Sequence, residues 1–241
     1  SGVLAITGTS AFTVAGGRNI TLDQSSTFSS TVTFASSGTI ASVEINDSNA
    51  FDLKTLTTTG NLTVTAGGNI TDSGTVTVGG NLAATTDANN GVIDLGTLAV
   101  DGTMALATHG TGAATVVNDA GLNFAASTVG GALSATATTG NVAQSGALTI
   151  TGVTTIAADS GNNITLDNTS NNFQAAVRIT SGNNVTLVDA GAIDLGASTV
   201  SGTYAVTATA VGDITDSGVL AITGTSAFTV AGGRNITLDQ S

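Results

Sequence analysis

The side chains that could carry acid, base or nucleophilic chemistry are few in this chain of 241 residues. It has one histidine, His109, one tyrosine, one lysine and no cysteine, which leaves few candidates for a general acid, a general base or a nucleophile. His109 precedes a glycine, and Ser37 and Ser181 hold the equivalent positions in two other copies of an internal repeat. We therefore predict that His109 lies in a surface turn and is not catalytic.

Paired carboxylates are the other chemistry that the composition permits, because two acids can together cleave a glycosidic bond. The candidate pairs are Asp189 with Asp194 and Asp213 with Asp216, and Arg178 is the candidate cation. Aspartates near turns also accept hydrogen bonds from the backbone, and we predict this structural role for them. The sequence thus predicts no catalytic residue and no enzyme. A polysaccharide-degrading site is the alternative.

Metal binding is weakly indicated. Isolated acids such as Asp72, Asp94 and Asp167 could bind a cation between neighbouring turns, but the calcium-binding nonapeptide GGxGxDxUx is absent. We predict no metal site and no cofactor.

Asparagine and threonine recur in short motifs. Six Asn-x-Thr sequences would permit glycosylation, although a turn asparagine followed by a strand that alternates apolar residues with threonine creates the same pattern. They begin at Asn19, Asn61, Asn69, Asn163, Asn184 and Asn235. Thr-x-Thr pairs such as Thr63 with Thr65 could bind ice if they were aligned. However, Thr65 corresponds to Ala137 and Thr209, so ice binding is a minor alternative.

The sequence repeats at two levels. Residues 1–25 return unchanged as residues 217–241, so residues 1–216 form one block of a tandem repeat. The block contains three weaker copies, or sub-repeats, of about 72 residues, which span 8–79, 80–151 and 152–223. Each sub-repeat again contains a long, a middle and a short unit, which makes about ten units in all. Nested repeats are typical of a solenoid, so we predict one continuous segment, residues 1–241, of a longer array.

The composition excludes several classes of protein. Only 8% of the residues are charged and proline is absent, while 41% are hydrophobic, which is too apolar for a disordered chain. The net charge of -12 disfavours nucleic acid and anionic lipid as partners. No stretch of about 18 apolar residues predicts a transmembrane helix.

Strand patterns are dense and turns are short. Residues 62–65, 75–78 and 147–150 alternate apolar side chains with threonine or another small residue, which is typical of half-buried strands. Paired glycines and asparagines between them suit tight turns. An antiparallel sandwich would not require repetition at the levels of sub-repeat and block. A parallel β-helix explains it, because equivalent residues then stack in equivalent environments.

The length of a sub-repeat suggests how many turns the helix makes. Three turns of about 24 residues or four of about 18 residues would fit one sub-repeat, and we favour three. About ten turns, at roughly 4.8 Å each, would give a rod on the order of 50 Å long. The seven phenylalanines are expected to fill its core. They are Phe12, Phe28, Phe34, Phe51, Phe124, Phe173 and Phe228.

Three segments carry a family resemblance: GNLTVTAGGNITDSGTVTVGG, NNFQAAVRITSGNNVTLVDAGAIDLGASTVSG and GALSATATTGNVAQSGALTITG. Their repeat style resembles that of filamentous-haemagglutinin-like exoproteins of two-partner secretion systems, and the resemblance covers the whole chain. It implies a right-handed parallel β-helix in a large protein that is secreted through an outer-membrane partner and lies outside the bacterial cell or on its surface.

The function expected from this resemblance is structural. The chain would form a stiff stalk or filament for surface attachment, cell contact or matrix. Its partners would be adjacent repeats, other copies in a filament, and surface glycans. A carbohydrate-binding β-helix is the alternative from a different class of function.

Overall fold

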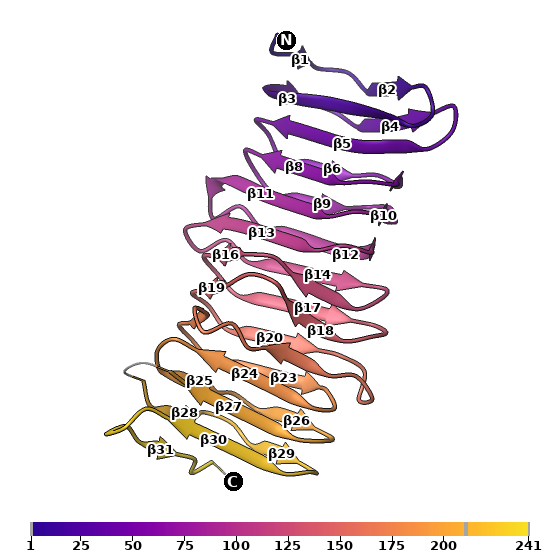
Figure 1. Ribbon diagram of the computed structural model, residues 1–241. Helices are drawn as coiled ribbons and strands as arrows, with labels where there is room; N and C mark the ends of the chain where they lie inside the picture. The colour runs from indigo at the N-terminus through magenta and orange to yellow at the C-terminus, as the bar shows by residue number, and fades with distance from the viewer. Residues whose placement is uncertain (1, 210–211, 241) are drawn as a thin grey trace.

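The computed structural model describes residues 2–209 and 212–240, and they form a right-handed parallel β-helix of about 11 turns (Figure 1). This confirms the predicted fold class. All strand pairs are parallel, and each strand pairs with the strand one turn before it or one turn after it. The described residues include no helix that could cross a membrane.

The turns are flattened, so the strands lie in two stacks, which we call face A and face B. Face A consists of β1 (Ala5–Ile6), β3 (Arg18–Phe28), β5 (Ile40–Asp47), β8 (Leu62–Ala66), β11 (Leu82–Asn89), β13 (Met104–His109), β15 (Leu122–Phe124), β16 (Ser127–Val129), β18 (Val142–Gln144), β19 (Leu148–Ile150), β21 (Ile164–Leu166), β22 (Asn172–Phe173), β24 (Val185–Asp189), β27 (Tyr204–Ala208) and β30 (Ser226–Val230).

Face B consists of β2 (Ser10–Val14), β4 (Val32–Ser36), β6 (Phe51–Leu53), β7 (Leu56–Thr58), β9 (Ile70–Asp72), β10 (Val76–Val78), β12 (Ile93–Val100), β14 (Ala114–Asn118), β17 (Leu133–Ala137), β20 (Thr154–Ala157), β23 (Val177–Ser181), β25 (Ile193–Leu195), β26 (Ser198–Val200), β28 (Ile214–Asp216), β29 (Leu220–Ile222) and β31 (Ile236–Thr237).

Alternation along each strand builds the core. In β8, Leu62, Val64 and Ala66 are buried while Thr63 and Thr65 point outward, as the period-two pattern predicts. The buried residues of both faces join into one apolar core along the rod. The phenylalanine prediction is confirmed. Four of the seven are buried, and Phe12, Phe34 and Phe228 are partly buried against the same core.

The expectation of three turns per sub-repeat is wrong, because each turn uses fewer residues than a third of a sub-repeat. Leu62 stacks on Leu82, Leu82 on Met104, and Met104 on Phe124, so three turns take the chain from Leu62 only to Phe124. The counterpart of Leu62 in the second sub-repeat is Leu133, which lies further along the chain in β17 and on face B. One sub-repeat thus makes about three and a half turns.

Each face alternates between two kinds of strand. A turn usually places one longer strand on one face and two short strands, joined by a bend, on the other. Thus the longer strand β8 lies opposite the short strands β9 and β10. The two kinds exchange faces about once per sub-repeat. At one such exchange, β13 pairs with both β15 and β16, so two short strands follow one long strand on face A.

Asparagines line the corner at which the chain enters face A. The Oδ1 atom of Asn61 accepts the backbone N–H of Asn81 at 2.9 Å, and that of Asn81 accepts the N–H of Thr103 at 2.9 Å. The same contacts link Asn141, Asn163 and Asn184. The ladder thus joins amide side chains mainly to the backbone of the next turn, with one bond between the side chains of Asn184 and Asn163.

Candidate functional site

Buried polar side chains mark the places where a long strand stacks on a bent pair of short strands of the preceding turn. Asp47, Asn118 and Asp189 occupy these places, one in each sub-repeat, and each is at most 1% exposed. The bend leaves one backbone N–H without a strand partner, and the side chain accepts it. Asn118 Oδ1 lies 2.8 Å from the nitrogen of Val100, and Asp189 Oδ2 lies 2.7 Å from the nitrogen of Phe173.

The two aspartates of this set have perturbed acidity. Burial raises the pKa of Asp189, and the N–H groups of Phe173 and Gly191 oppose the rise because they stabilise the carboxylate. Burial likewise raises the pKa of Asp47, against bonds from Asn49 and Phe28. Asparagine fills the same position in the middle sub-repeat. The shared element is therefore a hydrogen-bond acceptor, which fits the structural role predicted for Asp189.

Serines mark the opposite exchange, where a bent pair stacks on a long strand of the preceding turn. Ser127 Oγ accepts the backbone N–H of Leu106 at 3.0 Å, and Ser198 Oγ accepts that of Ile179 at 3.1 Å. Leu56 holds the matching position of the first sub-repeat. A leucine side chain accepts no hydrogen bond, and there β4 forms no ladder with β6 or β7 within the described chain.

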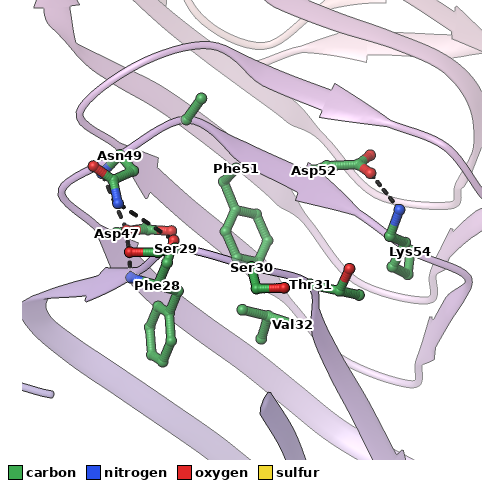
Figure 2. A pocket seen from close by; sticks show the side chains of 11 residues that line it. Phe28, Ser29, Ser30, Thr31, Val32, Asp47, Asn49, Phe51, Asp52 and Lys54 are labelled. Atoms are coloured by element: carbon green, nitrogen blue, oxygen red, sulfur yellow. Dashed lines mark hydrogen bonds and ion pairs between the residues drawn. The ribbon is translucent and has the colours of Figure 1, made fainter. Parts of the chain in front are cut away.

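A cleft of about 430 Å³ opens at this irregular exchange, between the end of β3, β4 and β6 (Figure 2). Phe28 and Phe51 line it, although each is only 3% exposed. Lys54, at its edge, replaces the small residues Ala125 and Gly196 of the other two sub-repeats. The repeat is therefore broken at this exchange. Alignment of the three sub-repeats would have revealed the change at Lys54 and Leu56, which the sequence reasoning missed.

The polar groups of the cleft form two clusters, one on each side of Phe51 in Figure 2. In one, Asp47 accepts the N–H of Asn49 at 3.1 Å, and the Asn49 amide donates to the Phe28 carbonyl at 3.3 Å. In the other, Lys54 Nζ lies 2.5 Å from Asp52 Oδ2 in the one ion pair found among the described residues.

The second cluster retains some capacity to bind. Ser73 Oγ lies 2.8 Å from Lys54 Nζ and 2.9 Å from Asp52 Oδ2. Asp52 Oδ1 accepts no hydrogen bond from the described part of the chain. The Lys54 ammonium group and nearby hydroxyls can hold a small polar molecule.

The acids considered from sequence do not form a site. Asp189 is buried and bonded to the backbone, whereas Asp194 lies at the outward position of β25. Asp213 accepts the N–H of Asn235, and Asp216 accepts that of Asp239. Arg178 is exposed on β23.

The remaining candidates also occupy turns and strands. The Nδ1 atom of His109 lies 2.6 Å from the Thr86 carbonyl of the preceding turn, and His109 itself is exposed. Asp72 bonds to the backbone of Gly96 and Thr97, and Asp94 and Asp167 are exposed. No three potential metal ligands cluster anywhere in residues 2–209 or 212–240.

Comparison with known proteins gives a family and no individual relative. No curated protein and no solved structure matches the chain. A family model described as "Repeats of unknown function (DUF5649)" matches residues 41–101, 111–180 and 182–241. The starts of the three matches follow the spacing of the sub-repeats, and together the matches cover most of the chain. The chain therefore belongs to this family of repeats.

Proposed function

We propose that the chain is a structural, non-enzymatic segment of a large secreted bacterial fibre or adhesin. The parallel strand ladder carries this proposal. On face A, register pairs continue from β3 to β30 without a break. The hydrogen bonds between turns run along the rod axis, so a pull on the ends of the rod loads many of them together.

Export and location are the finer part of the proposal. The repeat style resembles filamentous-haemagglutinin-like exoproteins, which leave the cell through an outer-membrane partner. A β-helix suits such export because each turn packs only against its neighbours, so a chain that emerges unfolded can fold turn by turn. The chain has no cysteine, so no disulfide has to form on the way.

Attachment is the proposed task of the fibre. Few singular side chains interrupt the surface, and a stalk needs length and stiffness more than a reactive site. The net charge of -12 favours separate, soluble rods. Surface glycans are the proposed contacts, and neighbouring copies of the fibre are the other partner in the filament form of this proposal.

Electron microscopy of arrays with one, two and three blocks tests the proposal. We expect rods that lengthen by about 50 Å per block, from about 4.8 Å per turn. A matched array in which Leu62 and Val64 are replaced by aspartate in every block should lose the rod shape. Compact particles whose length does not grow with block number would contradict a stalk. Bundles that grow with concentration would support the filament form.

Carbohydrate binding at the cleft is the second candidate function. It is favoured by the departure from the repeat at Lys54 and Leu56, which opens the cleft beside the Asp52–Lys54 pair. Calorimetric titration with a panel of soluble oligosaccharides tests it. The variant K54A/L56S restores the residues of the middle sub-repeat and should abolish binding, whereas A125S, at the matching position without a cleft, should not. Equal oligosaccharide affinities for K54A/L56S and A125S would eliminate this candidate.

A further inference from the structure

The two identical copies of the terminal sequence lie on opposite faces of the rod. Ser10–Val14 forms β2, which pairs with β4 on face B. Ser226–Val230 has the same sequence and forms β30, which pairs with β27 on face A. In both strands the threonine, Thr13 or Thr229, points outward while its neighbours face the core. Copies separated by one block are thus turned away from each other.

Strand register explains the reversal. Ten steps of one turn each connect Ile20 to Ser226 along face A, through Val43, Leu62, Leu82, Met104, β15, Val142, Ile164, Val185 and Tyr204. Ser226 therefore stacks in the column of Ile20. Its identical counterpart, Ser10, precedes Ile20 by about half a turn and lies on face B. One block therefore makes about ten and a half turns.

The exchange of strand types makes this half-integer period possible. Each sub-repeat makes about three and a half turns, so the next begins on the other face. A long strand and a bent pair must then stack on each other at every exchange. The acceptors at Asp47, Asn118 and Asp189 and the hydroxyls of Ser127 and Ser198 satisfy the N–H groups left over at five of these exchanges, and the exchange at Leu56 is the exception. Equivalent positions of the sub-repeats thus supply acceptors on either face.

We infer that successive blocks of the array display the same surface on opposite sides of the rod. One block advances about 50 Å along the axis with a half-turn reversal, and the same face returns after two blocks, or about 100 Å. A partner that recognises the surface of one block is consequently bound on both sides, so a single rod can bridge two surfaces that carry the same ligand. The bridging rests on the proposed adhesive function, whereas the alternation rests on strand register alone.

Paired gold labels on the chain test the alternation. Thr13 and Thr229 are exposed and have identical neighbours. In the cysteine variant T13C/T229C, with a maleimide gold cluster on each cysteine, electron microscopy should show the two labels on opposite sides of every rod. The control T13C/T215C places both labels on face B at a similar axial separation, so any overall twist of the rod affects both pairs similarly. Its labels should lie on one side.

The outcomes separate this inference from the proposed function. Labels on the same side of a T13C/T229C rod would overturn the alternation and leave the fibre proposal intact. Opposite labels on rods that fail to lengthen with added blocks would support the alternation and count against the fibre. An unlabelled sample of T13C/T229C, compared with the native chain by circular dichroism, shows whether the substitutions preserve the fold.

Discussion

Single side chains satisfy the backbone at most of the places where the type of strand on a face changes. Asp47, Asn118 and Asp189 each accept a backbone N–H at a bend where no neighbouring strand can do so. A buried N–H without an acceptor costs on the order of 1–3 kcal/mol. Asp189 is one of the candidate acids in the sequence, and its burial and backbone bonds give it the structural role predicted for it.

Replacement of Asp189 should separate acceptor from charge. Asp189→Ala leaves the Phe173 N–H unsatisfied, so we expect a loss of roughly 1–3 kcal/mol in the free energy of unfolding. Asp189→Asn keeps an acceptor for the Phe173 N–H, as Asn118 does for that of Val100, and gives up only the bond from Gly191, so its loss should be smaller than that of the alanine variant. Urea unfolding measures both. Equal losses for the two variants would mean that the bond to the Phe173 N–H is not what stabilises the site.

The raised pKa values of Asp47 and Asp189 predict a pH dependence. The folded state holds these protons more tightly than the unfolded state, whose aspartates titrate at about pH 3.9. Their contribution to stability is therefore greatest below that pH and falls as pH rises through the raised pKa. The unfolding free energy of D47N/D189N minus that of the native chain should increase with pH over this window. A difference that is flat or decreasing would refute the assignment.

At the scale of elements, corners and exchanges hold successive turns in register. The asparagine ladder supplies hydrogen bonds at a corner where the strands have ended. Small residues allow the close approach of the turns at other corners. A Cβ atom added to Gly67 would collide with the carbonyl of Ser48 in the preceding turn. Corner residues therefore repeat even where strand residues drift.

Removal of one amide from the ladder should loosen a single corner. Asn163→Ala deletes the acceptor for the Asn184 N–H, and we expect a loss of about 0.5–1.5 kcal/mol, with faster hydrogen exchange at the amide of Asn184. Asn123→Ala is the matched control, because the side-chain oxygen of Asn123 accepts no hydrogen bond from the described residues. Similar losses from both variants would argue against the ladder.

Repair of the irregular exchange should close the cleft. In K54A/L56S the new serine can accept a backbone N–H from β4, as Ser127 accepts that of Leu106. We expect slower hydrogen exchange at the amide of Phe34, which corresponds to Leu106. The single variant K54A, which retains Leu56, should leave that amide unchanged. Unaltered exchange in the double variant would mean that Leu56 does not cause the gap.

At the scale of the whole molecule, the rod combines an apolar core with an acidic surface. The chain has sixteen acidic residues and only four basic ones, and the isoelectric point lies near 4.1. Rods should therefore repel one another at neutral pH. Bridging by the proposed two-sided display would then come from bound partners and not from direct contact between rods.

Loss of charge should permit contact between rods. We expect light scattering to increase as the pH approaches 4.1, because the carboxylates become protonated and the repulsion disappears. At pH 7, raising the salt concentration should produce a weaker increase, since salt screens the charges without removing them. Strong association at pH 7 in low salt would show that the faces attract each other despite their charge.

The amino-acid sequence by itself determined the class of fold. Alternation in segments such as residues 62–66 specifies which side chains face inward, glycine and asparagine specify the corners, and repetition requires stacked equivalent turns. The core position of the phenylalanines and the structural role of Asp189 followed from these local rules. The cleft was also encoded, at Lys54 and Leu56, but only a comparison of the three sub-repeats exposes that signal.

Only the tertiary structure decided how many turns a repeat makes and which face each copy occupies. Sequence spacing measures length along the chain, whereas a turn closes wherever bends and stacking allow, sooner between Val177 and Leu195 than between Ile20 and Val43. The segment SAFTV shows the consequence, because it forms β2 on face B and β30 on face A. Local preferences are identical in the two copies, so only the accumulated register of all the turns between them can assign the face.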